Sequence, residues 1–320
     1  MKRILCAGSV TVDVIVTPAD SIPAPGTLRA VESVTTHVGG CAANAAIDLA
    51  HLGVPVRLSC RVGRDGFGAF VKETAASAGV DVRGVVEDAE TSTTVSIVCV
   101  NTSGERSFLY CPGSAAAYRR TDVTPELLEG TDILFVAGAM LLTSFDGAPC
   151  AALLRDARAK GIFTVMDTAW DFEDKWLPKI EAALPWLDLF MPSREEAAAL
   201  TGEEEPRRMA EKLLAMGPRS VIIKLGREGA LFCPEGEEPF RLPAYQMQAV
   251  DTTGAGDAFC AGFLAGLAQG WDFRRSGAFA NAVGAHCVMA VGASAGVPSA
   301  AAVLQFMDEH KESPPLIRIS

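Results

Sequence analysis

The sequence predicts an α/β fold in which βα units are stacked on a parallel sheet. Short apolar runs alternate with helical patterns along most of the 320 residues. The runs are nearly continuous, as expected for strands that are buried on both faces of a sheet. Each helical pattern closes with a glycine, which favours the left-handed turn at a helix end. The predicted strands are RILCAGS, VRLSCRV, DILFVAG, FTVMD, LDLFM and SVIIKL, and the predicted helices are residues 41–52, 66–78, 146–160 and 204–216.

Two stretches, residues 14–38 and 91–111, depart from this alternation. Both contain Thr/Val-rich segments, and the second includes the turn sequence NTSGER, which is typical of antiparallel hairpins. We therefore expect a small separate sheet. Phe108 and Tyr110 alternate along one face of the second hairpin, where they either contact a ligand or pack the sheet itself.

The remaining segments predict neither a second domain nor a membrane span. We find no repeat or dividing linker, and we expect one domain over residues 1–320. Residues 276–307 lack Asp, Glu, Lys and Arg and are long enough to span a membrane. Because Asn281, several glycines and Pro298 interrupt them, they predict two buried helices joined by a loop. Near the N-terminus, Asp13 interrupts the apolar run, which favours a first strand over a signal peptide.

The composition excludes several kinds of partner. The chain has 28 Lys and Arg against 39 Asp and Glu, a formal net charge of −11. Since we find no basic cluster, we expect neither a nucleic acid nor a membrane surface as a partner. Nine cysteines without a C-x-x-C pair favour reduced thiols over a disulfide framework. These features predict a cytoplasmic protein.

The segment DTTGAGD at residues 251–257 is the most informative for function. An apolar helical pattern, AFCAGFLAGLAQG, follows it directly. Glycines let backbone N–H groups approach an anion, and a helix start adds unpaired donors. The segment therefore predicts a phosphate site at Gly254, Ala255 and Gly256. Asp257 can take a proton from a hydroxyl that attacks the phosphate, or it can simply stabilise the helix start.

DTTGAGD with the helix that follows closely resembles the C-terminal signature of the ribokinase-like (PfkB) family of sugar and nucleoside kinases. GSVTVD at residues 8–13 resembles the family's first strand with its substrate aspartate, and VGGCAANAA at residues 38–46 resembles its glycine pair before a helix. The resemblance runs in order over residues 4–299. It implies a doubly wound, mostly parallel sheet flanked by helices, with the small β-sheet as a lid over the sugar.

The resemblance places the acceptor sugar at the end of the first strand, where open parallel sheets bind ligands. Asp13 would accept hydrogen bonds from two sugar hydroxyls. Gly39 and Gly40 would let the ligand touch backbone, and Asn44 would offer a donor and an acceptor. The structural alternatives are a solvated strand end for the aspartates and an ordinary turn for the glycines. The other candidate substrate residues are Thr11 and Asp167.

The resemblance also implies ATP and Mg²⁺. SREE at residues 193–196 matches the family's Asn-x-x-Glu, which helps organise magnesium around the triphosphate, with Ser193 in place of Asn. Ser-x-x-Glu is also a capping box, in which Ser193 and Glu196 satisfy each other's backbone donors without a metal. The remaining candidate nucleotide residues are Lys224, Gly226, Gly229 and Asn281. The alternatives are a solvated strand residue for Lys224, a plain turn for the two glycines, and a helix Asn bonded to backbone for Asn281.

Members of the family often hold a monovalent cation such as K⁺ beside the anion site through backbone oxygens. They also often pair through the exposed faces of their lids, which makes a homodimer through the lid the expected assembly. The positions that match the cation ligands are Asp251, Thr253, Ala290 and Ser299.

The acceptor is less well defined than the reaction. Compared with ribokinase itself, Thr11 replaces an Asn, Cys41 replaces a Lys, and Ala139 or Met140 replaces an acidic sugar ligand, so ribose is not favoured. DTAWD at residues 167–171 keeps only the first residue of the Asp-x-Asn-x-Arg of fructokinase-like and ketodeoxygluconate-kinase-like relatives.

We therefore expect an ATP-dependent kinase that phosphorylates a hydroxymethyl group of a small sugar or sugar-like molecule, with Asp257 as the general base. A nucleoside is the alternative acceptor, with Tyr110 or Trp170 as a stacking partner. A sugar-binding protein without catalysis is the alternative from another class. A dinucleotide-dependent dehydrogenase is disfavoured because no G-x-G-x-x-G follows the first strand.

Overall fold

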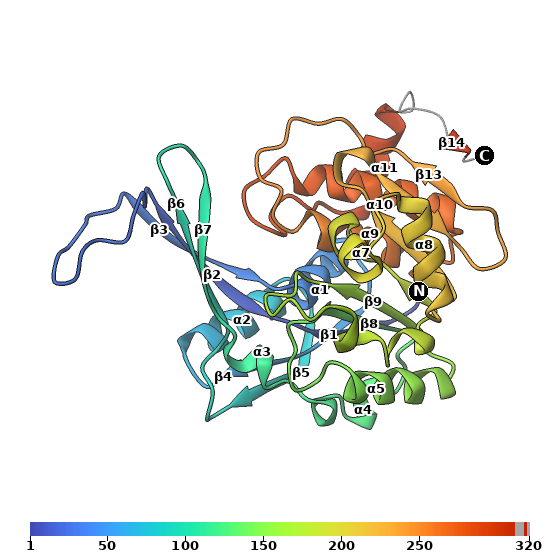
Figure 1. The fold of residues 1–320 in the computed structure, drawn as a ribbon, viewed down its shortest axis with the longest axis horizontal. Helices are drawn as coiled ribbons and strands as arrows, with labels where there is room; N and C mark the ends of the chain where they lie inside the picture. Colours follow the sequence, from blue (N-terminus) through green and yellow to red (C-terminus); the bar gives the residue numbers. More distant parts are fainter. Residues whose placement is uncertain (311–316, 319–320) are drawn as a thin grey trace.

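The computed structural model describes residues 1–310 and 317–318 and contains two sheets with helices packed around the larger one (Figure 1). The strands of the larger sheet are β1 (Ile4–Gly8), β4 (Val56–Gly63), β5 (Asp81–Asp88), β8 (Ile133–Ala139), β9 (Phe163–Thr168), β10 (Leu189–Phe190), β11 (Ser220–Lys224), β12 (Ala230–Cys233), β13 (Phe240–Leu242) and β14 (Ile317–Arg318). Their spatial order is β14-β13-β12-β11-β10-β9-β8-β1-β4-β5. The strands from β11 to β5 run parallel, and β12 to β14 are antiparallel.

Helices cover both faces of this sheet and form two apolar cores. Because side chains alternate along a strand, Ile4 and Cys6 of β1 belong to one core, and Leu5 and Ala7 belong to the other. The helices of the first core are α1 (Cys41–His51), α2 (Gly66–Ser77), α9 (Ala255–Ala268), α10 (Phe273–Cys287) and α11 (Ala300–Glu309). Those of the second core are α3 (Gly113–Ala116), α4 (Pro125–Leu128), α5 (Ala148–Ala159), α6 (Leu177–Ile180), α7 (Arg194–Thr201) and α8 (Pro206–Ala215), and short 3-10 turns are η1 (Arg120–Asp122), η2 (Leu184–Trp186) and η3 (Gly226–Glu228).

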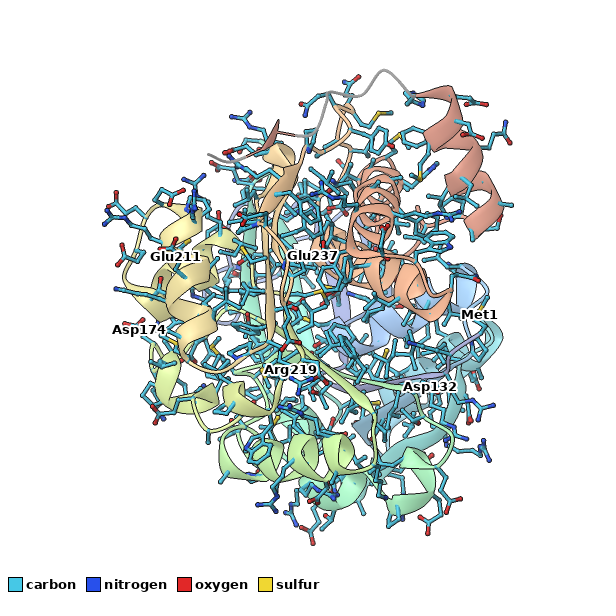
Figure 2. All side chains as sticks on the ribbon, turned by 90° about the vertical axis from the view of Figure 1, so that its right-hand side faces the viewer. Met1, Asp132, Asp174, Glu211, Arg219 and Glu237 are labelled. Carbon is cyan, nitrogen blue, oxygen red and sulfur yellow. The ribbon has the colours of Figure 1, made fainter. Side chains whose placement is uncertain are left out.

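Side chains fill the space between sheet and helices, whereas charged side chains such as Asp132, Glu211 and Arg219 lie at the surface (Figure 2). All the predicted strands of the parallel sheet are present. The strand β5 was not predicted, because half-buried and exposed polar residues interrupt its apolar character. Within the described part of the chain, no helix is both long and apolar enough to cross a membrane.

Residues 276–307 form two helices joined by a loop, as predicted, but only the first is buried throughout. Most residues of α10 are buried, whereas α11 buries only Val303 and Phe306 and exposes its other face. The prediction of a second buried helix was therefore wrong for α11, which is an amphipathic helix at the surface.

The smaller sheet consists of β2 (Thr11–Thr17), β3 (Ser33–Gly39), β6 (Val95–Val100) and β7 (Arg106–Cys111), in the order β3-β2-β6-β7. It projects from the body of the molecule (Figure 1). The two hairpins are antiparallel as predicted, but β2 and β6, which join them, run parallel. Asp13 pairs with His37 and with Ser96, which pairs with Tyr110. Directly paired residues share one face, which we call the inner face.

Candidate active site

Asp257 lies where the carboxyl ends of the parallel strands meet the start of α9. The Asn44 side chain of α1 donates from Nδ2 to Asp257 Oδ2 at 2.8 Å. Asp257 itself is half-buried. Burial raises the pKa of Asp257, although the hydrogen bond from Asn44 and the charge of Lys224 oppose the rise. The structure therefore brings two predicted residues, 213 positions apart in sequence, into direct contact at the carboxyl ends of the strands.

The start of α9 has the form of an anion site. Gly254 adopts a left-handed conformation with φ 76°, and a Cβ at this position would lie 2.5 Å from Ala293 O. The first helical bond runs from Ala258 N to Gly254 O at 2.8 Å, so the N–H groups of Gly256 and Asp257 precede the helical ladder. Ala255 differs from the prediction, because its N–H already donates to Thr252 O at 3.3 Å.

Asp13 lies on the inner face of the smaller sheet and is half-buried. Burial raises the pKa of Asp13 to about 6, and the charge of Asp257 adds to the rise while His37 opposes it. A Cβ on Gly39 would lie 2.4 Å from Asp13 Oδ2. Gly39 therefore leaves room for the carboxylate.

The other candidate substrate residues lie nearby but are less available. Gly40 has φ 88° and precedes α1; a Cβ there would lie 2.6 Å from Val10 Cα, so chain packing alone requires this glycine. Thr11 is buried in β2 and pairs with Gly39. Close packing thus accounts for these residues without a ligand.

Asp167 and Lys224 form a buried ion pair at the ends of β9 and β11. Lys224 Nζ lies 2.7 Å from both carboxylate oxygens of Asp167. Burial by itself would lower the pKa of Lys224, but the negative charge of Asp167 outweighs this effect and raises it. A Cβ on Gly256 would lie 3.5 Å from Lys224 Nζ. The pair therefore places a fixed positive charge beside the start of α9.

Ser193 and Glu196 form the capping box that their spacing predicts. Ser193 Oγ accepts from Glu196 N at 3.2 Å, and Glu196 Oε2 accepts from Ser193 N at 2.8 Å. The same oxygen accepts from Thr168 Oγ1 at 2.9 Å. Burial raises the pKa of Glu196, and the charge of Asp167 adds to this rise. Glu196 thus stabilises the start of α7 and also lies near the Asp167–Lys224 pair.

A cavity of about 380 Å³ lies beside the Lys224 end of this site. Asn281 lines it, but its Nδ2 already donates to Leu242 O at 3.3 Å and Pro243 O at 3.1 Å. Gly229 has φ 92°, and a Cβ there would lie 2.0 Å from Leu242 O, so the approach of backbone explains this glycine. Other residues that line the cavity are Lys224, Gly226, Gly256, Phe259, Gly284 and Val288.

Asp251 joins the turn before α9 to the turn after α10. Its Oδ1 accepts from Thr253 N and Thr253 Oγ1 at 2.9 and 2.7 Å, and its Oδ2 accepts from Gly292 N at 3.1 Å. Ala290 lies in the second of these turns. Ser299, the fourth predicted cation position, is exposed, and its hydroxyl caps α11 by accepting from Ala302 N.

Two functional features were not found by sequence reasoning. Arg106, the first residue of β7, donates from Nη1 to Thr253 Oγ1 at 2.8 Å and from Nη2 to Asp251 Oδ1 at 3.1 Å. These contacts join segments about 145 residues apart in the chain, so no local pattern could reveal them. The second feature is the set of contacts through which Asp171 organises the loop that follows β9.

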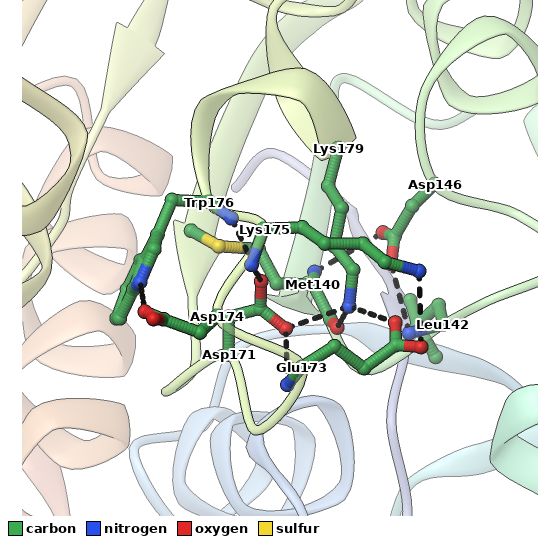
Figure 3. Close-up of polar contacts among 9 residues, drawn as sticks. All are labelled: Met140, Leu142, Asp146, Asp171, Glu173, Asp174, Lys175, Trp176 and Lys179. Atoms are coloured by element: carbon green, nitrogen blue, oxygen red, sulfur yellow. Dashed lines mark hydrogen bonds and ion pairs between the residues drawn. The ribbon is translucent and has the colours of Figure 1, made fainter.

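Asp171 organises this loop, and Figure 3 shows its contacts. Its carboxylate accepts from the backbone of Glu173, Lys175 and Trp176 and from Lys179 Nζ at 2.7 Å. Lys179 Nζ also donates to Met140 O at 2.8 Å, which ties the loop to the end of β8. The loop exposes the side chains of Trp170 and Phe172, and the Phe172 ring lies 5.8 Å from that of Tyr110 on the smaller sheet.

Comparisons with known proteins identify the family. A family model described as pfkB family carbohydrate kinase matches residues 1–300. The chain is 32% identical over 310 residues to an ATP-dependent ribose-1-phosphate kinase of Halopiger xanaduensis, with coverage of 97% of this chain and 99% of the relative. It is 27% identical over 316 residues to a nucleoside kinase of Methanothermobacter thermautotrophicus, with coverage of 98% and 99%.

The fold is also that of a solved relative. The structure of Arabidopsis thaliana ribokinase complexed with ribose and ATP matches with a TM-score of 0.85 at 24% identity, over 96% of this chain and 98% of that chain. The predicted ribokinase-like sheet, with helices on both faces and a smaller sheet beside it, is confirmed.

Proposed function

Because the chain belongs to the pfkB family of carbohydrate kinases, we propose that it transfers the γ-phosphoryl group of ATP to a hydroxymethyl group of a small sugar or sugar-like acceptor. The observation that carries the proposal is the position of Asp257, half-buried at the start of α9. A carboxylate beside unpaired backbone donors suits proton removal from an alcohol next to a phosphate.

Each step of the transfer has a residue suited to it. Asp257 takes the proton of the acceptor hydroxyl. The hydroxyl oxygen of the acceptor then bonds to the γ-phosphorus while the bond between that phosphorus and the ADP oxygen breaks. Asn44 orients Asp257 through its 2.8 Å hydrogen bond. The N–H groups at the start of α9 and the ammonium of Lys224 stabilise charge on the transferred group. Asp13 accepts hydrogen bonds from acceptor hydroxyls.

The residues present fit ATP and Mg²⁺. The cavity beside Lys224 is lined largely by glycines and apolar side chains, which suits the nucleoside part of ATP. The hydrogen bonds that the Glu196 carboxylate accepts from Ser193 N and Thr168 Oγ1 both use Oε2, so Oε1 can face Mg²⁺ through water. When bound, Mg²⁺ would neutralise part of the charge of the phosphates. Gly226 and Gly229 line the same cavity.

The test is the variant Asp257→Asn, which keeps the shape of the side chain and removes the base. General-base catalysis is worth roughly 10² to 10⁴ in rate, so we expect kcat to fall by about that factor while calorimetry still detects binding of ATP and acceptor. Asp132→Asn is the matched control. Asp132 is exposed and directly precedes β8, at the amino end of that strand, where its carboxylate accepts from Arg3 N. Unchanged turnover in Asp257→Asn would refute the assignment.

A nucleoside is the second candidate acceptor, and one observation favours it. Tyr110 and Phe172 bring two rings, 5.8 Å apart, to the inner face of the smaller sheet, and exposed aromatic rings can stack on a base. A coupled ADP-release screen over ketoses, aldoses, sugar acids and nucleosides separates the candidates. Turnover confined to nucleosides would replace the sugar as the proposed acceptor. Absence of ATP turnover with every acceptor tested would favour a sugar-binding protein without catalysis.

We further propose that residues 1–320 act as one kinase domain with the smaller sheet as its lid, and that two copies pair through the outer face of that lid. Ile97 and Leu109 pair on this outer face, and both are exposed together with Val34. An exposed apolar strand face favours burial by a partner. A mass near twice that of the chain in sedimentation analysis is the expected result.

Two further assignments are proposed with this function. The unpaired state of all nine cysteines, which lie within the described residues, favours a cytoplasmic enzyme. K⁺ would bind beside Asp251 and Thr253, next to the turn that contains Ala290. The exposed position of Ser299 gives the weakest support among these ligands, and stimulation of turnover by K⁺ over Na⁺ tests the site.

A further inference from the structure

Asp251 is the meeting point of three segments that are far apart in the chain. It bonds to Thr253 in its own turn, to Gly292 in the turn after α10, and to Arg106 from the smaller sheet. Its carboxylate is therefore held by donors from all three segments.

Arg106 is the residue through which the smaller sheet reaches this meeting point. It stands at the start of β7, an edge strand that is exposed at every position. Its guanidinium spans Thr253 Oγ1 and Asp251 Oδ1. The side chain of Asp251 is only 4% exposed, whereas that of Arg106 is 40% exposed. One partner is thus fixed in the body, and the other is attached to the projecting sheet.

We propose that Arg106 is a positioning residue that latches the smaller sheet onto the turn at residues 251–254, so that lid closure and order in the anion site become one event. This inference rests on the proposed kinase function and extends it. The turn leads directly into Gly254, which packs against Ala293 too closely for a Cβ. A displacement of the 251–254 turn therefore moves the backbone donors of α9.

The inner face of the smaller sheet provides one other contact that would act with this latch. Tyr110, four residues after Arg106 on the same strand, lies against Phe172 of the loop after β9. Residues at even spacing on a strand share a face, so both contacts come from one side of β7. The aromatic contact touches the acceptor side of the site, and Arg106 touches the phosphate side. The latch thus spans both substrates.

The chemical consequence concerns water. A closed lid excludes water, which otherwise competes with the acceptor hydroxyl for the γ-phosphoryl group. Without the Arg106 contact, the lid should spend more time open, and water should take a larger share of the transfers. The latch therefore predicts a change in the ratio of ATP hydrolysis to acceptor phosphorylation as well as a change in rate.

Arg106→Gln tests the latch, and Arg29→Gln is its matched control. Arg29 also belongs to the smaller sheet region, but its guanidinium donates to Ser21 Oγ within that region. Amide hydrogen exchange of the ligand-free protein is the first measurement. We expect Arg106→Gln to speed exchange over residues 251–257 and 290–293 by roughly fivefold, the size expected when one charge pair is lost, and Arg29→Gln to leave it unchanged.

Two further measurements separate positioning from a structural role. Arg106→Gln should raise the acceptor KM and the share of ATP lost to hydrolysis, and Arg106→Lys, which keeps the charge, should restore both in part. Unchanged exchange over residues 251–257 in Arg106→Gln, or an equal change in Arg29→Gln, would overturn the proposal. Because exchange is measured without substrates, this outcome is independent of whether Asp257 is the general base.

Discussion

The two sheets of this protein use apolar strands in opposite ways. Every residue of β8 in the large sheet is buried, and every residue of β7 in the small sheet is exposed, although both strands carry a phenylalanine near their middle. The large sheet has helices on both faces, so packing fixes its side chains. In the small sheet, strand pairing determines which face each side chain lies on. Its contacts with the body include those of Arg106 and Tyr110. Packing thus fixes the first sheet beneath the site, and we propose that the second adjusts the site.

Phe135 and Phe108 give the strongest test of this contrast, because one residue type occurs in both sheets. Phe135 in β8 is fully buried, and Phe108 in β7 is 62% exposed. We expect Phe135→Ala to lower the free energy of unfolding by about 3–5 kcal/mol through a cavity and Phe108→Ala to change it by less than about 0.5 kcal/mol. Urea titration followed by circular dichroism measures both. Similar losses in the two variants would contradict the contrast.

Lys224 tests the same contrast with charges. Lys224→Met leaves the Asp167 carboxylate buried without its partner, which should cost about 3 kcal/mol of unfolding free energy. Lys72→Met is the control, because the Lys72–Glu87 pair is exposed and such pairs are worth at most about 1 kcal/mol. Thermal unfolding at low and high salt should show a salt-dependent change only for the exposed pair. Equal costs would mean that Asp167 is solvated after all.

Asp13→Asn should change stability in a way that depends on pH and has the opposite sign to the losses above. Since the pKa of Asp13 is raised to about 6, the folded protein holds a proton that the unfolded chain releases near pH 4. Stability therefore falls as pH rises between these values. We expect the variant to be more stable than the parent by up to about 3 kcal/mol well above pH 6 and equal to it below pH 4, with acceptor binding lost.

Calorimetry across this pH range checks the sign as well as the size of the Asp13 effect. A variant that was less stable at pH 7 would mean that the carboxylate contributes to folding rather than to the acceptor site. Asp251→Asn offers the opposite sign, because the pKa of Asp251 is lowered to about 2. The stability that this carboxylate provides should be present above pH 4 and lost as pH falls toward 2.

Much of the fold and the centre of the site could be predicted because their determinants are local. Buried parallel strands are continuous apolar runs, and a helix start that receives an anion needs glycine and a short polar motif in one segment. Asp257 and Gly254 were therefore visible in seven residues. Ser193 and Glu196 were equally visible as a capping box, which the structure contains.

The features that sequence could not predict depend on distant or ambiguous contacts. Arg106 reaches Asp251 across the chain, and nothing near residue 106 encodes that partner. Gly229 had two explanations, and only the structure shows that Leu242 O occupies the space of its Cβ. Asn281 similarly bonds to backbone at the cavity wall. A residue type restricts chemistry, but the neighbour decides which use is made of it.

The loop after β9 has a consequence for the history of such an enzyme. One carboxylate, that of Asp171, gathers the loop backbone and Lys179 (Figure 3), while Trp170 and Phe172 face outward. Trp170 packs on Trp176 and Phe172 on Lys179, but the hydrogen bonds that hold the loop come from other residues. Substitution at these two positions would therefore change the side chains beside the proposed acceptor site and keep the bonds that fold the loop. A scaffold of this kind allows the choice of acceptor to drift while the phosphoryl-transfer chemistry is inherited unchanged.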